Sequence, residues 1–274
     1  MIGHCIASAL AEDKVNDDIT SLAIIGRSLN AEAQILLKQR SKIAGLIFLP
    51  RVFHAIDPNL SMQLHVEEGQ DCEKGEVLAT IHGSARSILA GERTALNLLQ
   101  HASGIATFTA KCVEETKGFC CDILDTRKTL PGLRELQKYA VKIGGGKNHR
   151  FNLSERFLIK NNHLALMERN SISEAIDKAR ALRADVKIEV EVEDLEQLFE
   201  ALESKADFIL LDNMDVEMVR EAVEMTKGRA YLEASGGMNL STIRSFAATG
   251  INGISVGALT HSPPAVDICL RMVV

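Results

Sequence analysis

Strongly basic side chains gather in one stretch of an otherwise acidic chain. Residues 127–163 contain nine lysines and arginines against two glutamates, a formal charge of +7, whereas the whole chain of 274 residues carries −6. The nine are Arg127, Lys128, Arg134, Lys138, Lys142, Lys147, Arg150, Arg156 and Lys160. Like charges held this close repel one another, and folding tolerates them most easily where an anionic ligand neutralises them. The segment therefore predicts a binding site for a strongly negative molecule.

The composition favours a small metabolite over a nucleic acid as that anion. A nucleic-acid surface usually combines a basic domain with aromatic side chains that stack on bases. This chain has a pI near 5.8, no tryptophan and only 4% aromatic residues. We therefore expect no nucleic-acid partner.

Spacing divides the basic residues into two groups. Arg134, Lys138 and Lys142 are four residues apart, which predicts one solvated helix face. The others of interest lie at the ends of apolar runs, where a solvated helix face does not explain them: Arg127, Lys128, His149, Arg150 and Lys160. We expect the second group to point inward.

Length and composition place the chain among globular proteins. It is 46% hydrophobic, enough to bury a full core, and no apolar run approaches the ~18 residues of a membrane span. The first residues lack the basic and apolar regions of a signal peptide, and the six cysteines form no Cys-x-x-Cys pair. We therefore expect a reduced cytoplasmic protein without structural zinc or a membrane partner.

The sequence pattern changes near residue 104. Before it, short runs and glycine turns indicate a small α+β domain. Its expected elements are a helix at 2–13, strand-like runs at 33–38, 43–48 and 62–66, a hairpin around 69–75 and a helix at 87–100.

After residue 104, short apolar runs alternate with helical stretches. The runs are 121–125, 157–161, 186–192, 208–212, 230–234 and 254–257, and the helices are 171–182, 195–202, 216–225 and 241–249. Repeated strand–helix units of this kind predict a parallel sheet, and six or more of them can close as a barrel. The pattern leaves room for a seventh strand but does not locate it.

Polar residues follow these apolar runs, where active sites form in parallel barrels. Cations come early and acids later. The last two ends carry small residues in front of helices, where backbone N–H groups and the helix dipole favour phosphate. The strand-end residues are Asp125 to Lys128, Lys160 to His163, Glu189 and Glu191, Asp212 and Asn213, Ser235 to Gly237, and Gly257.

These motifs together resemble the quinolinate phosphoribosyltransferase family, over nearly the whole chain. The resemblance rests on Glu92-Arg-Thr-Ala-Leu-Asn-Leu-Leu-Gln, Ser103-Gly-Ile-Ala-Thr, Asp125-Thr-Arg-Lys-Thr, Pro131-Gly-Leu-Arg, Gly144-Gly-Gly-Lys-Asn-His-Arg, Leu158-Ile-Lys-Asn-Asn-His, Leu211-Asp-Asn, Leu232-Glu-Ala-Ser-Gly-Gly and Val256-Gly-Ala-Leu. Any one motif alone is a weak signal, whereas the set is specific.

The resemblance implies a fold with two domains. We expect an N-terminal α/β sandwich at residues 1–103 and an incomplete parallel α/β barrel at 104–261, the type II phosphoribosyltransferase fold. The C-terminal segment 262–274 is expected to pack back onto the N-terminal domain. The resemblance also implies a homodimer or a multiple of dimers with shared active sites.

The resemblance implies an activity and a set of site residues. The family transfers the phosphoribosyl group of phosphoribosyl pyrophosphate (PRPP) to quinolinate, with loss of pyrophosphate and carbon dioxide, to give nicotinate mononucleotide. For quinolinate the implied residues are Arg127, His149, Arg150, Lys160 and His163, with Arg93 from the neighbouring subunit. For PRPP they are Lys128, Glu191, Asp212, Ser235, Gly236 and Gly257. Glu191 and Asp212 would also handle Mg²⁺, and Lys128, Lys160, Glu191 and Asp212 are the expected catalytic residues.

One departure from the family pattern and two alternatives remain open. Asn161 stands where the family more often has an acid, so a role for that acid is in doubt. One alternative is a related phosphoribosyltransferase of altered specificity, the molybdenum-associated paralogue or a nicotinate-using enzyme. The other is a non-catalytic anion-binding protein on the same barrel. Arg127, Lys128 and Lys160 argue against the paralogue. Retention of Glu191 and Asp212 argues against the anion-binding protein, because an anion binder gains nothing from acids that face its ligand.

Overall fold

The computed structural model describes residues 2–169 and 171–273, which form two compact units. The N-terminal unit comprises Met1–Ala110, Thr129–Gly145 and Thr260–Val274, and the barrel unit comprises Lys111–Lys128 and Gly146–Leu259. Each unit is therefore assembled from separate stretches of chain. The domain bounds expected from the sequence, 1–103 and 104–261, stay a prediction.

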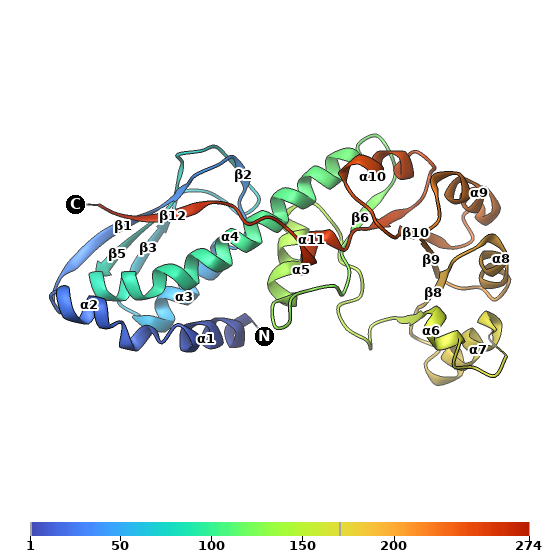
Figure 1. Ribbon diagram of the computed structural model, residues 1–274, viewed down its shortest axis with the longest axis horizontal. Helices are drawn as coiled ribbons and strands as arrows, with labels where there is room; N and C mark the ends of the chain where they lie inside the picture. Colours follow the sequence, from blue (N-terminus) through green and yellow to red (C-terminus); the bar gives the residue numbers. More distant parts are fainter. Residues whose placement is uncertain (1, 170, 274) are drawn as a thin grey trace. The chain divides into compact units, whose positions relative to one another are not determined.

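The N-terminal unit is built on an antiparallel sheet of four strands in the order β12-β1-β5-β3 (Figure 1). Ala33, Ile35 and Leu37 of β1 are fully buried, because alternate residues of a strand point to the same face. The chain returns from the barrel unit to pair β12 with β1 along its whole length. The strands are β1 (Asn30–Leu37), β3 (Ser61–Leu64), β5 (Val77–Ser84) and β12 (Ile268–Val273), with a short separate pair of β2 (Ser41–Lys42) and β4 (Asp71–Cys72).

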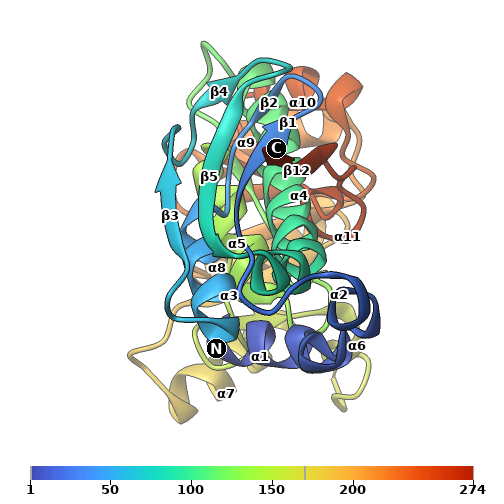
Figure 2. The ribbon, with the colours of Figure 1, turned by 90° about the vertical axis from the view of Figure 1, so that its left-hand side faces the viewer.

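A helix of 31 residues, α4 (Ala85–Glu115), lies alongside this sheet (Figure 2). Gly104 lies within it, and a Cβ there would be only 2.1 Å from the carbonyl oxygen of Pro264, so only glycine lets the returning segment pass this close. The other helices of the unit are α1 (Ile2–Glu12), η1 (Val15–Asp17), α2 (Ile19–Ile24), η2 (Leu46–Phe48), α3 (Leu49–Ile56) and α5 (Arg134–Ile143). No helix of the described chain combines the length and the apolar composition that crossing a membrane requires.

Three sequence predictions about this unit are wrong in detail. The strand expected at 43–48 is absent, and its second half forms the 3₁₀ helix η2. The helix expected at 87–100 continues to residue 115, because Ile105, Ala106 and Cys112 extend its buried face. The solvated face expected for α5 fails at Lys138, which is only 1% exposed and lies beside buried Leu136 on the same helix.

The barrel unit is built on a parallel sheet of six strands in the order β6-β11-β10-β9-β8-β7. All six strands expected from the sequence are present: β6 (Asp122–Leu124), β7 (Phe157–Ile159), β8 (Ile188–Val192), β9 (Phe208–Asp212), β10 (Tyr231–Ser235) and β11 (Gly253–Ser255). Lys147 adds a single parallel bridge to Leu124, outside β6. Among residues 2–169 and 171–273 the sheet continues beyond β6 by this one bridge only, and the barrel is incomplete.

Helices follow most of these strands, and the sequence sets where they start. Ser171, Asp194, Asp215 and Asn239 cap four of them, each accepting a hydrogen bond from a backbone N–H of the first turn. The helices are α6 (Asn161–Leu164), α7 (Ile172–Leu182), α8 (Leu195–Glu203), α9 (Val216–Thr226), α10 (Leu240–Ala247) and α11 (Ala258–His261). The caps fix the loops between strand and helix, which carry the residues expected to bind substrate.

Candidate functional site

Most predicted site residues of the barrel unit lie at the carboxyl ends of its strands or shortly after them, whereas His149 and Arg150 follow the single bridge at Lys147. Because all six strands are parallel, these ends meet at one edge of the sheet. Arg127 and Lys128 follow β6, Lys160 and His163 follow β7, Glu191 is in β8, Asp212 ends β9, Ser235 ends β10, Gly236 follows it, and Gly257 follows β11. Arg93 lies on α4 of the N-terminal unit, where it is exposed.

Lys160 and Glu191 form an ion pair at this edge. The pairing of Ile159 with Val190 places the residues that follow them side by side, and Lys160 Nζ donates to Glu191 Oε2. The Glu191 side chain is 12% exposed and that of Lys160 42% exposed. His163 supports the same loop, since its Nδ1 accepts the Lys160 backbone N–H at 2.9 Å. Glu191, predicted to be catalytic, and Lys160, predicted to bind quinolinate, are therefore next to each other.

Both carboxylate oxygens of Asp212 are held in place. Ser235 Oγ donates to Oδ1 at 2.6 Å, and Asn213 Nδ2 donates to Oδ2 at 2.9 Å. Gly236 has a φ of +100°, and a Cβ there would lie 2.2 Å from Asn213 Oδ1. The glycine is therefore required by the close approach of Asn213, and through Asn213 it affects the position of Asp212.

Arg127 and Arg150 carry buried donors that find no acceptor within the described residues. The Nε atom of each is buried and has no hydrogen-bond partner there. Arg150 also donates from Nη1 to the carbonyl oxygen of Arg156 at 3.0 Å. Burial, and then the positive charge of Arg127, lowers the pKa of the Arg150 guanidinium below its usual value. Two neighbouring guanidinium groups with unused donors make a strong site for a carboxylate or phosphate.

A second group of charged residues lies deeper in the barrel. His149 is 9% exposed, Glu189 on β8 is fully buried, and Glu233 on β10 is 1% exposed. His149 Nε2 lies 2.9 Å from Glu189 Oε2 and 3.7 Å from Glu233 Oε2. These three could offer ligand atoms to a metal ion.

Arg156 and Ser255 complete this interior group. Arg156 Nη1 contacts Glu189 Oε2 at 3.2 Å, and its guanidinium carbon lies 3.9 Å from the centre of the Phe208 ring. Ser255 Oγ donates to Glu233 Oε1. Arg156, one of the nine basic residues of segment 127–163, is therefore a member of this interior group.

The interior acids have pKa values shifted in opposite directions. Burial raises the pKa of Glu189, but interactions with His149 and Arg156 outweigh that effect and bring it below the usual value. Burial, and then the charge of Glu189, raises the pKa of Glu233 to about 7. Near neutral pH Glu189 is therefore ionised and Glu233 is about half protonated, as expected for two close acids in a dry interior.

Sequence reasoning missed Glu233 and Ser255, although a signal was present. Glu233 precedes Ser235 by two residues and so lies on the same face of β10, as Glu189 lies on the same face of β8 as Glu191. An acid inside an apolar strand, two residues before a predicted ligand, marks a side chain that points into the barrel.

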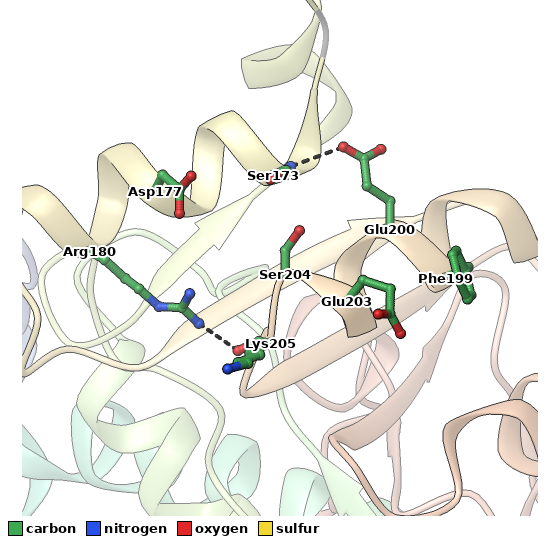
Figure 3. Close-up of a pocket in the computed structure, with 8 residues that line it drawn as sticks. All are labelled: Ser173, Asp177, Arg180, Phe199, Glu200, Glu203, Ser204 and Lys205. Carbon is green, nitrogen blue, oxygen red and sulfur yellow. Dashed lines mark hydrogen bonds between the residues drawn. The ribbon is translucent and has the colours of Figure 1, made fainter.

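A separate hollow lies between α7 and α8 and does not include any predicted site residue (Figure 3). It has a volume of about 500 Å³. Its polar groups largely bind one another: Glu200 Oε1 accepts the Ser173 backbone N–H, and Arg180 donates to the Lys205 carbonyl oxygen. The lining residues are Ser173, Asp177, Arg180, Phe199, Glu200, Glu203, Ser204 and Lys205. The strand-end edge of the barrel unit therefore stays the candidate site.

Two family models together match most of the chain. The model of the quinolinate phosphoribosyl transferase C-terminal domain matches residues 105–271, and that of the N-terminal domain matches residues 18–103. The two matches meet at residues 103 and 105, within α4.

Curated relatives carry matching names. A probable nicotinate-nucleotide pyrophosphorylase (carboxylating) of Bacillus subtilis is 44% identical over 260 residues, covering 94% of this chain and 89% of the relative. A nicotinate-nucleotide pyrophosphorylase (carboxylating) of Mycobacterium leprae is 41% identical, covering 97% of this chain and 95% of the relative.

Solved structures share the fold. NadC from Streptococcus pyogenes has a TM-score of 0.94 at 38% identity, covering 100% of this chain and 97% of that one. Nicotinate-nucleotide pyrophosphorylase from Ehrlichia chaffeensis has a TM-score of 0.95 at 36% identity, covering 100% and 99%. The expected fold class, a sandwich domain with an incomplete parallel barrel, is confirmed.

Proposed function

This chain belongs to the quinolinate phosphoribosyltransferase family, and we propose on that premise that it is a pentosyltransferase of NAD biosynthesis. It transfers the phosphoribosyl group of PRPP to quinolinate and releases pyrophosphate and carbon dioxide. The product is nicotinate mononucleotide. The activities named for relatives at 36–44% identity support this activity over that of a paralogue of altered specificity.

The unused donors of Arg127 and Arg150 carry the proposal. A buried donor without an acceptor costs about 1–3 kcal/mol, and more when the group is charged. The structure has two such donors, the Nε atoms of two neighbouring guanidinium groups. A bound anion would supply the missing acceptors and so remove this cost. Quinolinate is a pyridine with two adjacent carboxylates, so it can satisfy both groups at once, whereas an anion with one carboxylate can satisfy only one of them fully.

Quinolinate would be held by Arg127, Arg150 and Lys160. The planar fork of arginine pairs with a carboxylate through two hydrogen bonds, and lysine adds a point charge. Arg93 would reach the same substrate from a neighbouring subunit, consistent with its exposed position on α4. His149 and His163 would contribute by holding the backbone of Arg150 and Lys160, since the Nδ1 atom of each already accepts a backbone N–H from that residue.

PRPP would be held along the later strands. Ser235, Gly236 and Gly257 would bind the 5-phosphate with backbone N–H groups and the serine hydroxyl, and Lys128 would bind the pyrophosphate. The first helix after this loop, α10, is capped by Asn239, which takes the Ser241 N–H, so the loop itself must supply the donors. Glu191 and Asp212 would face the ribose.

Enzymes of this class typically use metal ions, and we propose Mg²⁺ for this one. Glu191 and Asp212 fit that ion, because Mg²⁺ prefers one or two carboxylates together with substrate phosphates. They lie on neighbouring strands, and Asp212 is oriented by Ser235 and Asn213. The ion would neutralise the charge that develops on pyrophosphate.

The chain's own groups act by position and charge. As the bond from C1′ to pyrophosphate breaks, the ribosyl carbon becomes cationic, and Glu191 and Asp212 stabilise that charge. The pyridine nitrogen, held by the carboxylate contacts, then forms the new bond to C1′. The ring nitrogen is now positive, so the adjacent carboxylate leaves as carbon dioxide and the electron pair left on C2 takes a proton. No nucleophilic serine or cysteine is needed.

Two further proposals concern assembly and location. A shared active site with Arg93 requires a homodimer or a multiple of dimers. A cytoplasmic location is consistent with six free cysteines.

A turnover assay tests the activity. Purified protein with quinolinate, PRPP and Mg²⁺ is expected to form nicotinate mononucleotide and carbon dioxide in equal amounts, both followed by chromatography and by trapping of labelled carbon dioxide. Omission of PRPP controls for spontaneous decarboxylation. Absence of the nucleotide product in folded protein would contradict the proposal.

A further inference from the structure

The interior of the barrel unit contains charged residues where parallel barrels usually pack branched apolar side chains. Glu189 and Glu233 are both at least 99% buried, and His149 lies between them. Burying two carboxyl groups together is unfavourable unless opposite charges and hydrogen bonds compensate the loss of solvation. None of the roles proposed for the edge residues accounts for this interior cluster.

The hydrogen bonds of His149 fix the position of its proton. Nδ1 accepts the backbone N–H of Arg150 at 2.7 Å, so Nδ1 carries a lone pair and not a proton. The ring proton is therefore on Nε2, which faces Glu189. Both ring nitrogens are engaged by the protein, and neither is left to bind a substrate carboxylate.

This tautomer also argues against a metal ion in the cluster. A histidine that binds a metal through Nε2 normally donates its Nδ1–H to an acceptor. Here Nδ1 faces the donor N–H of Arg150, and Arg156 already balances the charge of Glu189. A cation at His149, Glu189 and Glu233 would displace both arrangements.

The cluster bridges the open side of the incomplete barrel. Lys147 extends the sheet beside β6, whereas β7 is the opposite edge. Side chains join the two: Arg150 binds the carbonyl oxygen of Arg156 just before β7, and Arg156 and His149 both bind Glu189 on β8. Arg150 is thus fixed twice, through its backbone N–H by His149 and through its guanidinium by Arg156.

We propose that Glu189 is a positioning residue for the reaction: it holds His149 and Arg156, which in turn hold Arg150 against a substrate carboxylate. Glu189 itself does not touch substrate. The inference rests on the proposed function, since it gives Arg150 a carboxylate to bind. It assigns Glu189 to quinolinate binding, although Glu189 is not at the strand-end edge.

Charge within the cluster supports this assignment. The groups that face Glu233 are Glu189 from β8, His149 from the segment beside β6, Ser255 from β11 and Arg156 from before β7. Burial and then the charge of Glu189 raise the pKa of Glu233 to about 7, so below that pH Glu233 is mostly uncharged. Glu189 is the ionised carboxylate that accepts hydrogen bonds from both His149 Nε2 and Arg156 Nη1.

The test compares Glu189→Gln with Glu193→Gln, an exposed acid four residues along the chain. Glu189→Gln is expected to raise KM for quinolinate by about tenfold or more and to change KM for PRPP by less than about threefold. Glu193→Gln is expected to change neither. Glu233→Gln replaces a largely neutral carboxyl with a neutral amide, so at pH 6.5 it is expected to stay within about threefold of wild type. A general loss of structure would instead alter both KM values and the melting temperature together.

A second measurement does not depend on the fate of Glu189→Gln. ¹⁵N NMR of the imidazoles in the intact wild-type protein, with His149 assigned by its loss in His149→Asn, is expected to show the proton on Nε2. His149→Asn keeps an acceptor near the Nδ1 position and is expected to retain more quinolinate affinity than His149→Ala.

The outcomes distinguish failure of the proposed function from failure of the positioning role. Wild-type protein without quinolinate turnover would defeat the proposed function. Active wild type with an unchanged quinolinate KM in Glu189→Gln, a proton on Nδ1 of His149, or a stoichiometric metal lost in Glu233→Gln would overturn the positioning role alone.

Discussion

Replacement of Gly236 by alanine offers a sharp test of how the PRPP side of the site is built. Gly236 has a φ of +100°, and its added Cβ would lie 2.2 Å from Asn213 Oδ1 and 2.9 Å from Asn213 Cα. Asn213 is itself in the left-handed region, with a φ of 56°. It cannot keep its present position in Gly236→Ala, so its hydrogen bond to Asp212 is expected to break.

The size of the effect follows from these contacts. The left-handed backbone alone costs an alanine about 1–2 kcal/mol. The bond from Asn213 Nδ2 to the Asp212 carboxylate is charge-assisted and contributes about 1.5–3 kcal/mol. If Asp212 stabilises the ribosyl cation, that second amount appears as a loss of roughly 10- to 150-fold in kcat/KM for PRPP.

Gly237→Ala is the matched control. Gly237 also has a left-handed backbone, with a φ of +61°, but nothing lies within 4 Å of its added Cβ. Both variants should lose roughly the same few degrees of melting temperature from the backbone strain, about 2–4 °C per kcal/mol. Steady-state kinetics at varied PRPP should separate them, with Gly237→Ala within about threefold of wild type. Equal kcat/KM values in the two variants would refute the role given to Asn213 and Asp212.

Other predictions address the remaining parts of the site. Arg127→Gln and Arg150→Gln should each lower kcat/KM for quinolinate roughly 10- to 150-fold, the value of one charge-assisted contact, with PRPP affinity nearly unchanged in initial-rate assays. Inactive Arg93→Ala and inactive Lys160→Ala proteins, mixed under conditions of proven subunit exchange, should regain part of the activity; no regain would remove the shared site. Glu233 has a folded-state pKa of about 7 against 4.5 for the free side chain, so its contribution to stability is fully present below about pH 4.5 and is lost as the pH rises through about 7. Glu233→Gln should flatten that fall in chemical-denaturation profiles, and an unchanged profile would contradict the raised pKa.

Much of the barrel unit could be predicted from the sequence because its strands are short apolar runs with polar ends. The run expected at 186–192 contains β8 (Ile188–Val192), which is buried on both faces, and its alternation places Glu189 and Glu191 on one side. The helices expected at 171–182 and 195–202 begin within one residue of the expected positions, directly after the capping side chains of Ser171 and Asp194. Local signals of this kind survive folding because they depend on near neighbours in the chain.

The predictions failed where distant parts of the chain decide the outcome. Lys138 has helical spacing typical of a solvated face, yet α5 buries it. Position 104 requires glycine because Pro264, which is far along the sequence, passes close to it. The partners of Glu233 likewise come from other strands. No periodicity within a single element contains that information.

The central claim is that the basic site recognises two adjacent carboxylates, and one comparison tests it most directly. One preparation of the protein should be assayed with quinolinate and with nicotinate, which lacks the second carboxylate, at saturating PRPP and Mg²⁺. An unpaired buried guanidinium in the nicotinate complex predicts that kcat/KM for quinolinate is higher by about 100-fold or more. Turnover of nicotinate at equal or better efficiency would contradict the account.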